Sequence, residues 1–529
     1  MKKILIILNL AAATTLFSCH KILDIDPISN QGVNSFYKNY NEVSTALTGC
    51  YHGMQAPLGN EWMLTELRGT NSLQGVPNST SAQNIELNDL DMYMLNATHD
   101  KVYDYWLATY LNIRSVNHVL KSLGVSYAGG QVTMGVPTAI MNEQQRNQLA
   151  GEALVLRAYH YFNMVRLFGG VFLITEPVIP QEAKKIPRSP AADIYTFITA
   201  DLTKAAELLP ATRYNNMNTA DLGRATRWAA EGLLAKVYLT SGQKSKALPL
   251  LDDIISNSGH GLQSSYANVF SISNEMNSEI IFAVRYKAGG FGLGSPFANL
   301  FAATASGNAI VNNDGNGYNF PTAGTIAAYK YPASATGKDQ RRDVTLAYYT
   351  AAKPYVKKFL SQVVTRYDAE NDFPVLRYSD ILLMKAEAVG FDGPSGVSVG
   401  LINQVRERAG ALAYAGDGDF ATVFYRYPAS GDFAITTAQA FTDALMLERR
   451  LELAYENQQF FDMVRLGDAV TIMKDHFAAE YPNHYVNMRP VITLADLQSR
   501  VTAERMLLPI PQREIDTNDE QAIPQNPGY

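Results

Sequence analysis

Cys19 is the residue with the most clearly defined chemistry in this chain, because its thiol stands at the end of an export signal. The chain begins Met-Lys-Lys, continues with a short apolar run, and closes that run with Leu16-Phe17-Ser18-Cys19. A basic start, an apolar run too short to span a membrane and a small residue before the cut are typical of a cleaved signal peptide. A cysteine directly after the cut indicates a lipobox, in which the thiol takes a lipid and becomes the first residue of the mature protein. We therefore predict that residues 1–18 are removed and that residues 19–40 tether the body to a membrane outside the cytoplasm. The alternative is a secretory signal with an incidental cysteine.

Several charged residues lie beside apolar residues on predicted helices and resemble catalytic groups at first sight: Arg157, Glu387, Arg406, Glu448, Arg449 and Glu452. Buried or half-buried ion pairs that orient packed helices are the better interpretation. The sequence has no His-Glu-x-x-His pattern, and the glycine-rich run 289–294 lacks the spacing of a dinucleotide site. We therefore predict no catalytic residue, no cofactor and no metal site. Carboxylate pairs for glycoside hydrolysis stay open, because tertiary geometry sets them.

One short motif resembles the first half of a calcium loop: Asn312-x-Asp314-x-Asn316-Gly317. Its twelfth position is Ala323 in place of the usual glutamate, and Asp314 is its one carboxylate. Calcium binding needs more oxygen ligands than this pattern supplies, so a plain turn is favoured.

Four helical segments must position these residues, at about 147–170, 193–257, 378–409 and 441–466. In each, apolar residues recur at the spacing of one helix face. The second segment carries the clearest signature, Ala230-x-x-Leu233-x-Ala235-x-x-Tyr238-Leu239-x-x-Gly242-x-x-x-x-Ala247, which fits a tetratricopeptide helix-turn-helix. One such repeat cannot bury its apolar face alone, so several are expected to stack. Ser189 is the expected cap of the helix that covers 193–209.

Long irregular regions separate the helices, at about 55–100, 289–343 and 410–436, and they are rich in Gly, Ser, Asn, Thr and Tyr. Loops of this size on a rigid frame are usually functional. The sequence therefore predicts a mainly α body over 41–529, with a tetratricopeptide-like helical-repeat scaffold, a loop-rich ligand-binding part and a few short strands.

Composition limits the partners of this body. Hydrophobic residues make up 47% of the chain and charged residues 18%, which is typical of a globular protein. The net charge is −6 and no long basic run is present, which argues against a nucleic-acid partner. The second cysteine, Cys50, is expected to be a small buried hydrophobe.

An ordered set of motifs resembles the SusD/RagB family of outer-membrane nutrient-binding lipoproteins of Bacteroidetes. The set runs from the segment after Cys19 to the last residue, and its members include Leu23-Asp24-Ile25-Asp26-Pro27, Gly151-Glu152-Ala153-x-x-Leu156-Arg157-Ala158-Tyr159, Phe168-Gly169-Gly170, Ile402-Asn403-x-Val405-Arg406-x-Arg408-Ala409-Gly410, Glu448-Arg449-Arg450-x-Glu452 and Gln525-Asn526-Pro527-Gly528-Tyr529. One departure is Asn457, where the family pattern usually has glycine. Asparagine tolerates the left-handed backbone that glycine would adopt there.

The resemblance implies a lipid-anchored protein of the outer membrane that faces the cell exterior and is not an enzyme. Such a protein captures an oligomeric nutrient and passes it to a SusC-like TonB-dependent transporter. A glycan is the expected ligand, with a peptide as the alternative. A lipid-anchored surface glycosidase and a tetratricopeptide scaffold that binds only protein are the other function classes. A carboxylate pair at the base of a cleft would favour the glycosidase, and an open, aromatic-lined loop surface would favour the binder.

Sugar recognition needs rings that stack on C–H faces and polar groups that meet hydroxyls. By resemblance, loops within 61–93 and 289–331 form the ligand site. They supply the candidate ligand-binding residues Trp62, Arg68, Asn71, Tyr93, Phe291, Tyr318 and Phe320. For any single ring the alternative is local packing, because aromatics dominate cores; for Trp106, in a helical motif, we expect the core.

Overall fold

The computed structural model describes residues 36–329, 339–393, 396–410, 426–430 and 434–529. Cys19 and most of the predicted loop 410–436 lie outside these residues, so the lipid anchor and the predicted limits 1–18 and 19–40 remain expectations from the sequence. Within the described residues, no helix is long and apolar enough to cross a membrane.

A stack of antiparallel helices forms the frame of the molecule. Neighbours along the chain pack on one another in sequence order: α6 (Glu143–Phe168), α8 (Ala191–Leu208), α9 (Arg227–Thr240), α10 (Lys244–Asn257), α15 (Tyr378–Val389) and α16 (Val397–Gly410). Gly242 makes the turn between α9 and α10 with a φ of 73°, a backbone conformation that costs glycine least. The predicted tetratricopeptide-like stack is therefore confirmed.

Further helices pack on both ends of this stack. Before it come α2 (Tyr40–His52), α3 (Gln55–Thr65), α4 (Ala82–Asp91) and α5 (Asp100–Ser122). After it come α18 (Ala438–Glu452), α19 (Gln459–Leu466), α20 (Ala469–Glu480), α21 (Leu494–Arg500) and α22 (Gln512–Asp516). Short helices lie in the connections: α7 (Pro180–Ala183), α11 (Tyr266–Val269), α12 (Phe297–Phe301), α13 (Ala323–Ala328) and α14 (Arg341–Thr345).

The described strands form small antiparallel pairs. These are β1 (Ser72–Leu73) with β7 (Phe320–Pro321), β2 (Val125–Ala128) with β3 (Gln131–Met134), β4 (Val171–Phe172) with β5 (Arg188–Ser189), β6 (Ile280–Val284) with β10 (Phe373–Arg377), and β8 (Leu346–Thr350) with β9 (Lys353–Val356). The pair β6–β10 is buried along its whole length and enters the core beside α9. The expected mainly α fold with few short strands is thus observed.

Two regions differ from the sequence-based expectation. The stretch 55–100 is not simply irregular, because it contains α3 and α4. Ser189 does not cap α8: it lies in β5 opposite Val171, and Pro190 occupies the N-cap position without a side-chain bond. Asn457 does adopt the left-handed backbone expected of it, with a φ of 59°.

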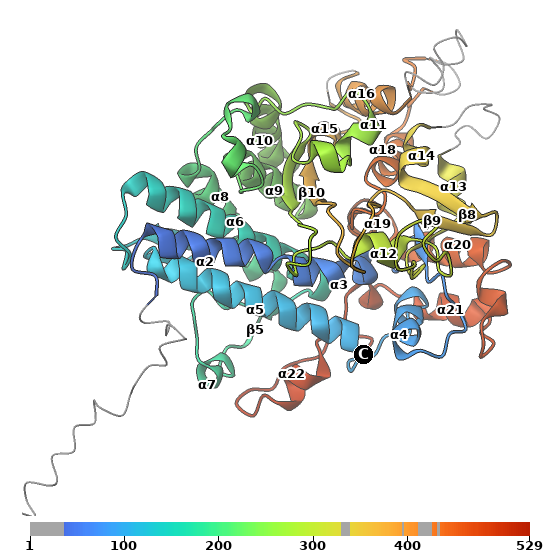
Figure 1. Cartoon of the computed structure of the whole chain (residues 1–529), viewed down its shortest axis with the longest axis horizontal. Helices are drawn as coiled ribbons and strands as arrows, with labels where there is room; N and C mark the ends of the chain where they lie inside the picture. Colours follow the sequence, from blue (N-terminus) through green and yellow to red (C-terminus); the bar gives the residue numbers. More distant parts are fainter. Residues whose placement is uncertain (1–35, 330–338, 394–395, 411–425, 431–433) are drawn as a thin grey trace, which may run out of the picture.

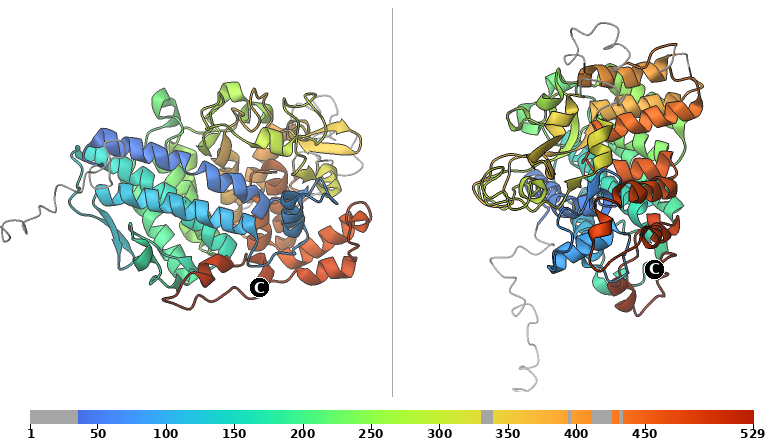
Figure 2. Two further views of the ribbon diagram at one scale, coloured as in Figure 1. Left: turned by 60° about the horizontal axis from the view of Figure 1, so that its bottom comes forward. Right: turned by 90° about the vertical axis from the view of Figure 1, so that its right-hand side faces the viewer.

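Along the long axis of the molecule, one end is built from long helices and the other from short elements and loops. In Figure 1 the helices α2, α5, α6 and α8 lie towards one end of the long axis, whereas α12, α13 and the hairpin β8–β9 lie towards the other. The left view of Figure 2 shows the same separation, with the yellow segments gathered at the end away from the start of the long blue helix. The frame therefore presents the loops at one end.

Candidate functional site

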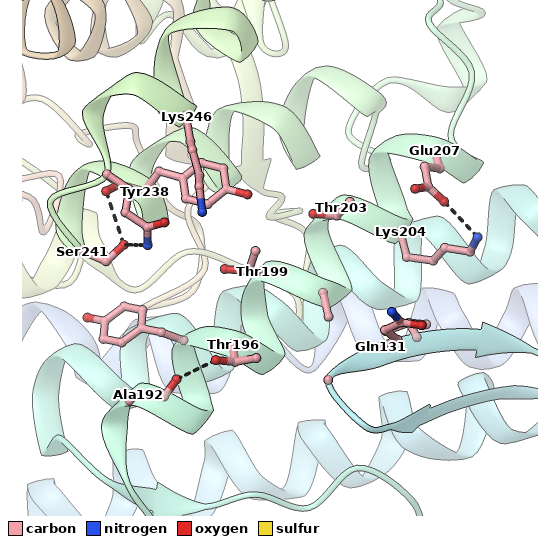
Figure 3. A pocket seen from close by; sticks show the side chains of 15 residues that line it. Gln131, Ala192, Thr196, Thr199, Thr203, Lys204, Glu207, Tyr238, Ser241 and Lys246 are labelled. Carbon is pink, nitrogen blue, oxygen red and sulfur yellow. Dashed lines mark hydrogen bonds and ion pairs between the residues drawn. The ribbon is translucent and has the colours of Figure 1, made fainter.

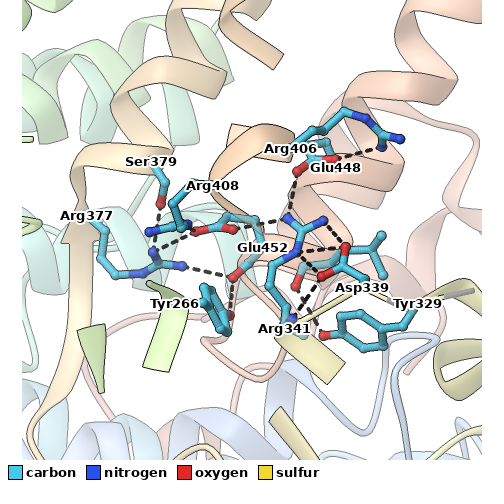
Figure 4. Close-up of polar contacts among 12 residues, drawn as sticks. Tyr266, Tyr329, Asp339, Arg341, Arg377, Ser379, Arg406, Arg408, Glu448 and Glu452 are labelled. Atoms are coloured by element: carbon cyan, nitrogen blue, oxygen red, sulfur yellow. Dashed lines mark hydrogen bonds and ion pairs between the residues drawn. The ribbon is translucent and has the colours of Figure 1, made fainter. Parts of the chain in front are cut away.

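The charged residues that resemble catalytic groups are engaged in buried ion pairs, and Figure 4 shows those around Glu448 and Glu452. Glu452 accepts hydrogen bonds from Arg341 at 3.1 Å and Arg377 at 2.9 Å and also from Arg408. Burial alone would raise the pKa of Glu452, but the charges of Arg408, Arg377 and Arg341 hold this pKa well below its ordinary value. The carboxylate therefore stays ionised and paired.

The other members of this predicted group are paired in the same way. Arg157 binds Asp201 at 2.8 Å, Arg406 binds Glu448 at 3.1 Å, Arg449 binds Asp380 at 2.8 Å, and Glu387 binds Arg465. All are buried. The interpretation of these residues as helix-orienting ion pairs is confirmed.

All four predicted ligand residues of the first loop region are buried. Trp62 is buried with its ring edge against Phe301 at 5.1 Å, and Tyr93 is buried with its hydroxyl donating to the carbonyl of Arg68 at 2.7 Å. Arg68 is buried too and donates to the carbonyls of Arg505 and Met506. Their side chains have packing contacts and no exposed surface for a ligand.

Asn71 completes this buried group. Its side-chain oxygen accepts from Arg450 at 2.8 Å, and its carbonyl accepts from Thr322 and Tyr455. These bonds join the N-terminal part of the chain to α18 and to the start of α13. A ligand-binding role stays an untested prediction for these four residues, Trp62, Arg68, Asn71 and Tyr93. In the structure they lie where distant segments of the chain meet.

The predicted residues of the second loop region divide between core and surface. Tyr318 is buried and Phe320 is half-buried in β7, whereas Phe291 is 70% exposed. Phe291 follows a turn that Asp368 holds in place, since one of its carboxylate oxygens accepts from the backbone N–H groups of Gly289 and Gly290 at 2.9 and 2.8 Å. A glycine is required at 289, because φ is 122° there and an added Cβ would lie 2.7 Å from the Phe291 ring.

A set of exposed polar and aromatic side chains lies on the segment that carries Asp368. Tyr367 is 40% exposed, and its hydroxyl donates to Asn316 at 3.2 Å. Arg366 donates to the same oxygen of Asn316 at 2.7 Å and lies over the Tyr367 ring, 5.0 Å from its centroid. We call Phe291, Asn316, Arg366 and Tyr367 the loop platform.

The backbone beneath the loop platform is fixed by buried or shielded polar groups. Asn299 is buried, donates to the carbonyls of Asn312 and Asp314, and accepts from the N–H of Tyr367 at 2.9 Å. Burial raises the pKa of Asp314, but the backbone N–H groups of Gly315, Ser306 and Gly307 more than offset this and leave its pKa below the ordinary value. The platform is therefore preorganised.

The same bonds explain the calcium-like motif. The Asp314 carboxylate is occupied by N–H donors, which fits the plain turn that the sequence favoured. Among the residues that the structure describes, no group of three or more His, Cys, Asp or Glu side chains is arranged to hold a metal ion.

Arg366 and Tyr367 do not appear among the sequence-based candidates. They lie between β9 and β10, outside the predicted loop 289–343, in a stretch with neither helical nor strand periodicity. The available signal was composition, because the run Thr365-Arg366-Tyr367-Asp368 places an aromatic ring among polar residues.

A separate hollow of about 800 Å³ lies at the other end of the molecule, between the hairpin β2–β3, α8 and the turn that joins α9 to α10. Figure 3 shows hydroxyl-bearing side chains along α8 facing this hollow, with Tyr238 and Lys246 on the opposite wall. Glu207 is the one carboxylate among its lining residues, and it is paired with Lys204 at 2.9 Å. The lining of this hollow thus lacks the carboxylate pair that a glycosidase would need.

Two family models match the chain. One, described as SusD family, covers residues 348–529, and the other, described as starch-binding associating with outer membrane, covers residues 21–239. Two SusD-like proteins of Formosa agariphila, P25 and P2, are each 25% identical to the chain; the matches cover 95% and 97% of this chain and 94% and 97% of theirs.

Solved structures share the fold at lower identity. A laminarin binding SusD-like protein superposes with a TM-score of 0.71 at 23% identity, over 93% of this chain and 100% of that one. Surface glycan-binding protein A from Bacteroides thetaiotaomicron, in complex with laminarihexaose, gives 0.70 at 18% identity, over 92% and 99%. These matches show the fold. The two family models, which together cover residues 21–239 and 348–529, show that the chain belongs to the SusD/RagB family, a family of non-catalytic glycan-binding proteins associated with the outer membrane.

Proposed function

We propose that this chain binds an oligosaccharide on the loop platform and delivers it to a SusC-like TonB-dependent transporter, while a lipid on Cys19 holds it on the outer face of the outer membrane. The observation that carries the binding step is the grouping of two exposed rings with polar side chains on a fixed backbone: Phe291 is 70% exposed and Tyr367 is 40% exposed. Arg366 and Asn316 lie beside Tyr367, and Asp368 holds the turn before Phe291.

The chemistry of the platform suits a sugar. A ring face stacks on the C–H face of a pyranose, and neighbouring amide and guanidinium groups bond its hydroxyls. Among the described residues, Asn316 uses its side-chain oxygen for Arg366 and Tyr367, so its amide nitrogen is the donor that a sugar hydroxyl would meet. Because Asn299 and Asp368 fix the backbone, binding would require little ordering of the loops.

Relatives suggest which glycans to test first. One similar structure is of a laminarin binding protein and another contains laminarihexaose. Laminarihexaose is therefore the first ligand of a panel that also contains starch-derived oligosaccharides and peptides of similar length.

The test is calorimetry with this panel on Phe291→Ala and Tyr367→Ala. We expect each variant to bind the cognate glycan at least about tenfold more weakly, because stacking contacts in carbohydrate and base recognition are worth on the order of 1–3 kcal/mol. The melting temperature should not change, since surface substitutions usually alter stability by less than about 0.5 kcal/mol.

Val364→Ala is the matched control, because Val364 is 94% exposed near the platform and carries no ring. Unchanged affinity in both aromatic variants would refute the platform. Binding of peptides in place of glycans would support the alternative ligand class, and shortening of the glycan during incubation would support a glycosidase.

A further inference from the structure

Two aliphatic side chains lie almost fully in solvent, close in space to the point where the described chain begins. Val136 is 90% exposed and Ile140 is 84% exposed, and both lie in the loop that joins β3 to α6. Isolated exposed aliphatics are common, but two on one short loop form an apolar projection that needs an explanation.

The loop that carries them is rigid. The carbonyl of Ser122, at the end of α5, accepts from the N–H and hydroxyl of Thr138 and from the N–H of Ala139. Ala139 itself is buried, and the guanidinium of Arg146 donates to the carbonyls of Leu123 and Gly135. Val136 and Ile140 are therefore held outward by the fold.

This projection lies where the N-terminal segment joins the body. The N–H of Ile140 donates to the carbonyl of Lys38 at 3.0 Å, and Asn39 forms a parallel bridge with Ile140. Residues 20–37 separate Lys38 from Cys19. A chain of that length spans at most about 65 Å, so a lipid on Cys19 would attach the body to the membrane through this end.

Positive charge surrounds the same place. Lys38, Arg114 and Lys121 are exposed. Burial and then the charges of Arg114 and Lys121 lower the pKa of His118, whose ring stacks on Tyr37 at 6.3 Å. The acidic side chains nearest in sequence are Glu42 and Glu143, and Glu42 accepts hydrogen bonds from the N–H of Lys38 and from Asn39.

We propose that Val136 and Ile140, with Lys38, Arg114 and Lys121 around them, form a membrane-contact patch that rests on an anionic lipid surface beside the lipid anchor. Apolar tips enter the interface while basic side chains approach the headgroup phosphates, which is the usual combination in peripheral membrane binding. In Figure 1 the start of α2, which follows Lys38 and Asn39, lies at the end away from α12, so the patch would hold the loop platform away from the membrane.

The proposal rests on the proposed anchor at Cys19 only for its orientation, and the first experiment removes that dependence. The mature chain with Cys19→Ala is sedimented with vesicles of phosphatidylcholine alone or mixed with phosphatidylglycerol. We expect binding to the anionic vesicles only. Arg114→Gln and Lys121→Gln should each weaken it about fivefold, since one basic residue near an anionic surface is worth about 1 kcal/mol.

The apolar part is tested with Val136→Ser/Ile140→Ser, which should weaken vesicle binding about tenfold because the two side chains then bury no apolar surface in the interface. Val364→Ser is the control, since Val364 is as exposed but lies near the loop platform. Equal binding by the double variant and the control would overturn the proposal.

A second measurement tests directly whether the side chain at position 140 contacts lipid. An environment-sensitive fluorophore is attached to Ile140→Cys or Val364→Cys; the native thiol of Cys50 is buried and its pKa is raised to about 12 by burial, so it should not compete. We expect a lipid-borne quencher to quench the label at 140 and not the label at 364. Shielding of position 140 only when the transporter is present would overturn the lipid assignment in favour of a protein contact.

Discussion

Glu61 is a carboxylate buried where α3, α6 and the turn after α18 meet. It accepts from Asn163 at 2.8 Å and from Asn457 at 3.4 Å. Burial raises its pKa to about 7, and the charge of Arg166 and these hydrogen bonds only partly oppose the shift. The folded state therefore holds a proton on Glu61 at pH values where the unfolded chain has lost it.

The sign of the resulting pH dependence follows directly. Because the pKa is higher in the folded state than in the unfolded chain, the free energy of unfolding falls as pH rises from about 4.5 to about 7. Glu61→Gln cannot ionise, so the loss of stability between pH 5 and pH 8 should shrink by about 2–3 kcal/mol, at about 1.4 kcal/mol for each pKa unit.

Urea unfolding at a series of pH values measures this difference. Glu176→Gln, at an exposed carboxylate, is the matched control and should leave the pH profile unchanged. Burial also raises the pKa values of Glu66 and Asp91 to about 7. These two carboxyl groups should cause the decrease in stability with pH that remains in Glu61→Gln and in the control. If the free energy of unfolding of Glu61→Gln fell with pH as steeply as that of the wild type, the raised pKa of Glu61 would be contradicted.

For single residues, the sequence predicted correctly which charged side chains are buried in ion pairs, but it did not predict which aromatic rings are exposed. Arginine and glutamate beside apolar residues on a helix indicate burial, and their pairing follows because an unpaired buried charge is too costly. Whether a ring is covered depends on segments far away in the chain. Trp62 is covered by Phe301, and the sequence near residue 62 does not indicate that contact.

Among the secondary-structure elements, the turn between α9 and α10 offers a clean test of backbone conformation. Gly242 and Gly49 both have open space where a Cβ would be added, but only Gly242 has a positive φ, of 73°. Gly242→Ala should therefore destabilise the protein by about 1 kcal/mol, whereas Gly49→Ala, inside α2, should stabilise it by about 0.5–1 kcal/mol.

Thermal and urea unfolding of the two variants measure the contrast. Opposite signs are expected because the added methyl group is sterically equivalent in both, and only the strain at position 242 differs. A stabilising Gly242→Ala would mean that the turn relaxes freely and that the α9–α10 packing does not depend on it.

The helices of the stack could be predicted because apolar residues recur along them at helical spacing. The third predicted segment begins at residue 378, where α15 begins in the structure. The fourth begins at 441, whereas α18 begins at Ala438 because Thr437 caps it. Helix α3 was missed for a physical reason. It contains Pro57 and Gly59 and is buried on several sides, so it shows no alternation between an apolar and a polar face.

For the molecule as a whole, attachment is the first property to test. Cys19→Ala should leave a folded protein that no longer fractionates with membranes, because one lipid-bearing residue is the proposed anchor and the proposed membrane-contact patch binds only weakly on its own. Metabolic labelling with a radioactive fatty acid reports the lipid. Label that persists in the variant would refute the lipobox.

The proposed transporter partner is tested by gentle solubilisation. Native membranes should yield this chain together with a large outer-membrane transporter, whereas the Cys19→Ala variant reports how much of that association survives without the lipid. Recovery of the native chain as a lone monomer would count against delivery to a transporter.

The buried bonds of Asn71 and Arg68 have a consequence for how this chain can change over time. The two matched family models divide it into an early and a late part, yet Asn71 is bonded to Arg450 and Arg68 to the carbonyls at 505 and 506 across that division. In a chimera that takes residues 21–239 from one relative and residues 348–529 from another, the bond between Asn71 and Arg450 forms only if the first parent supplies the asparagine and the second the arginine. Asn71 and Arg450 should therefore be inherited together, while the exposed ring of Phe291, which we propose contacts the ligand, can be exchanged to suit a new nutrient.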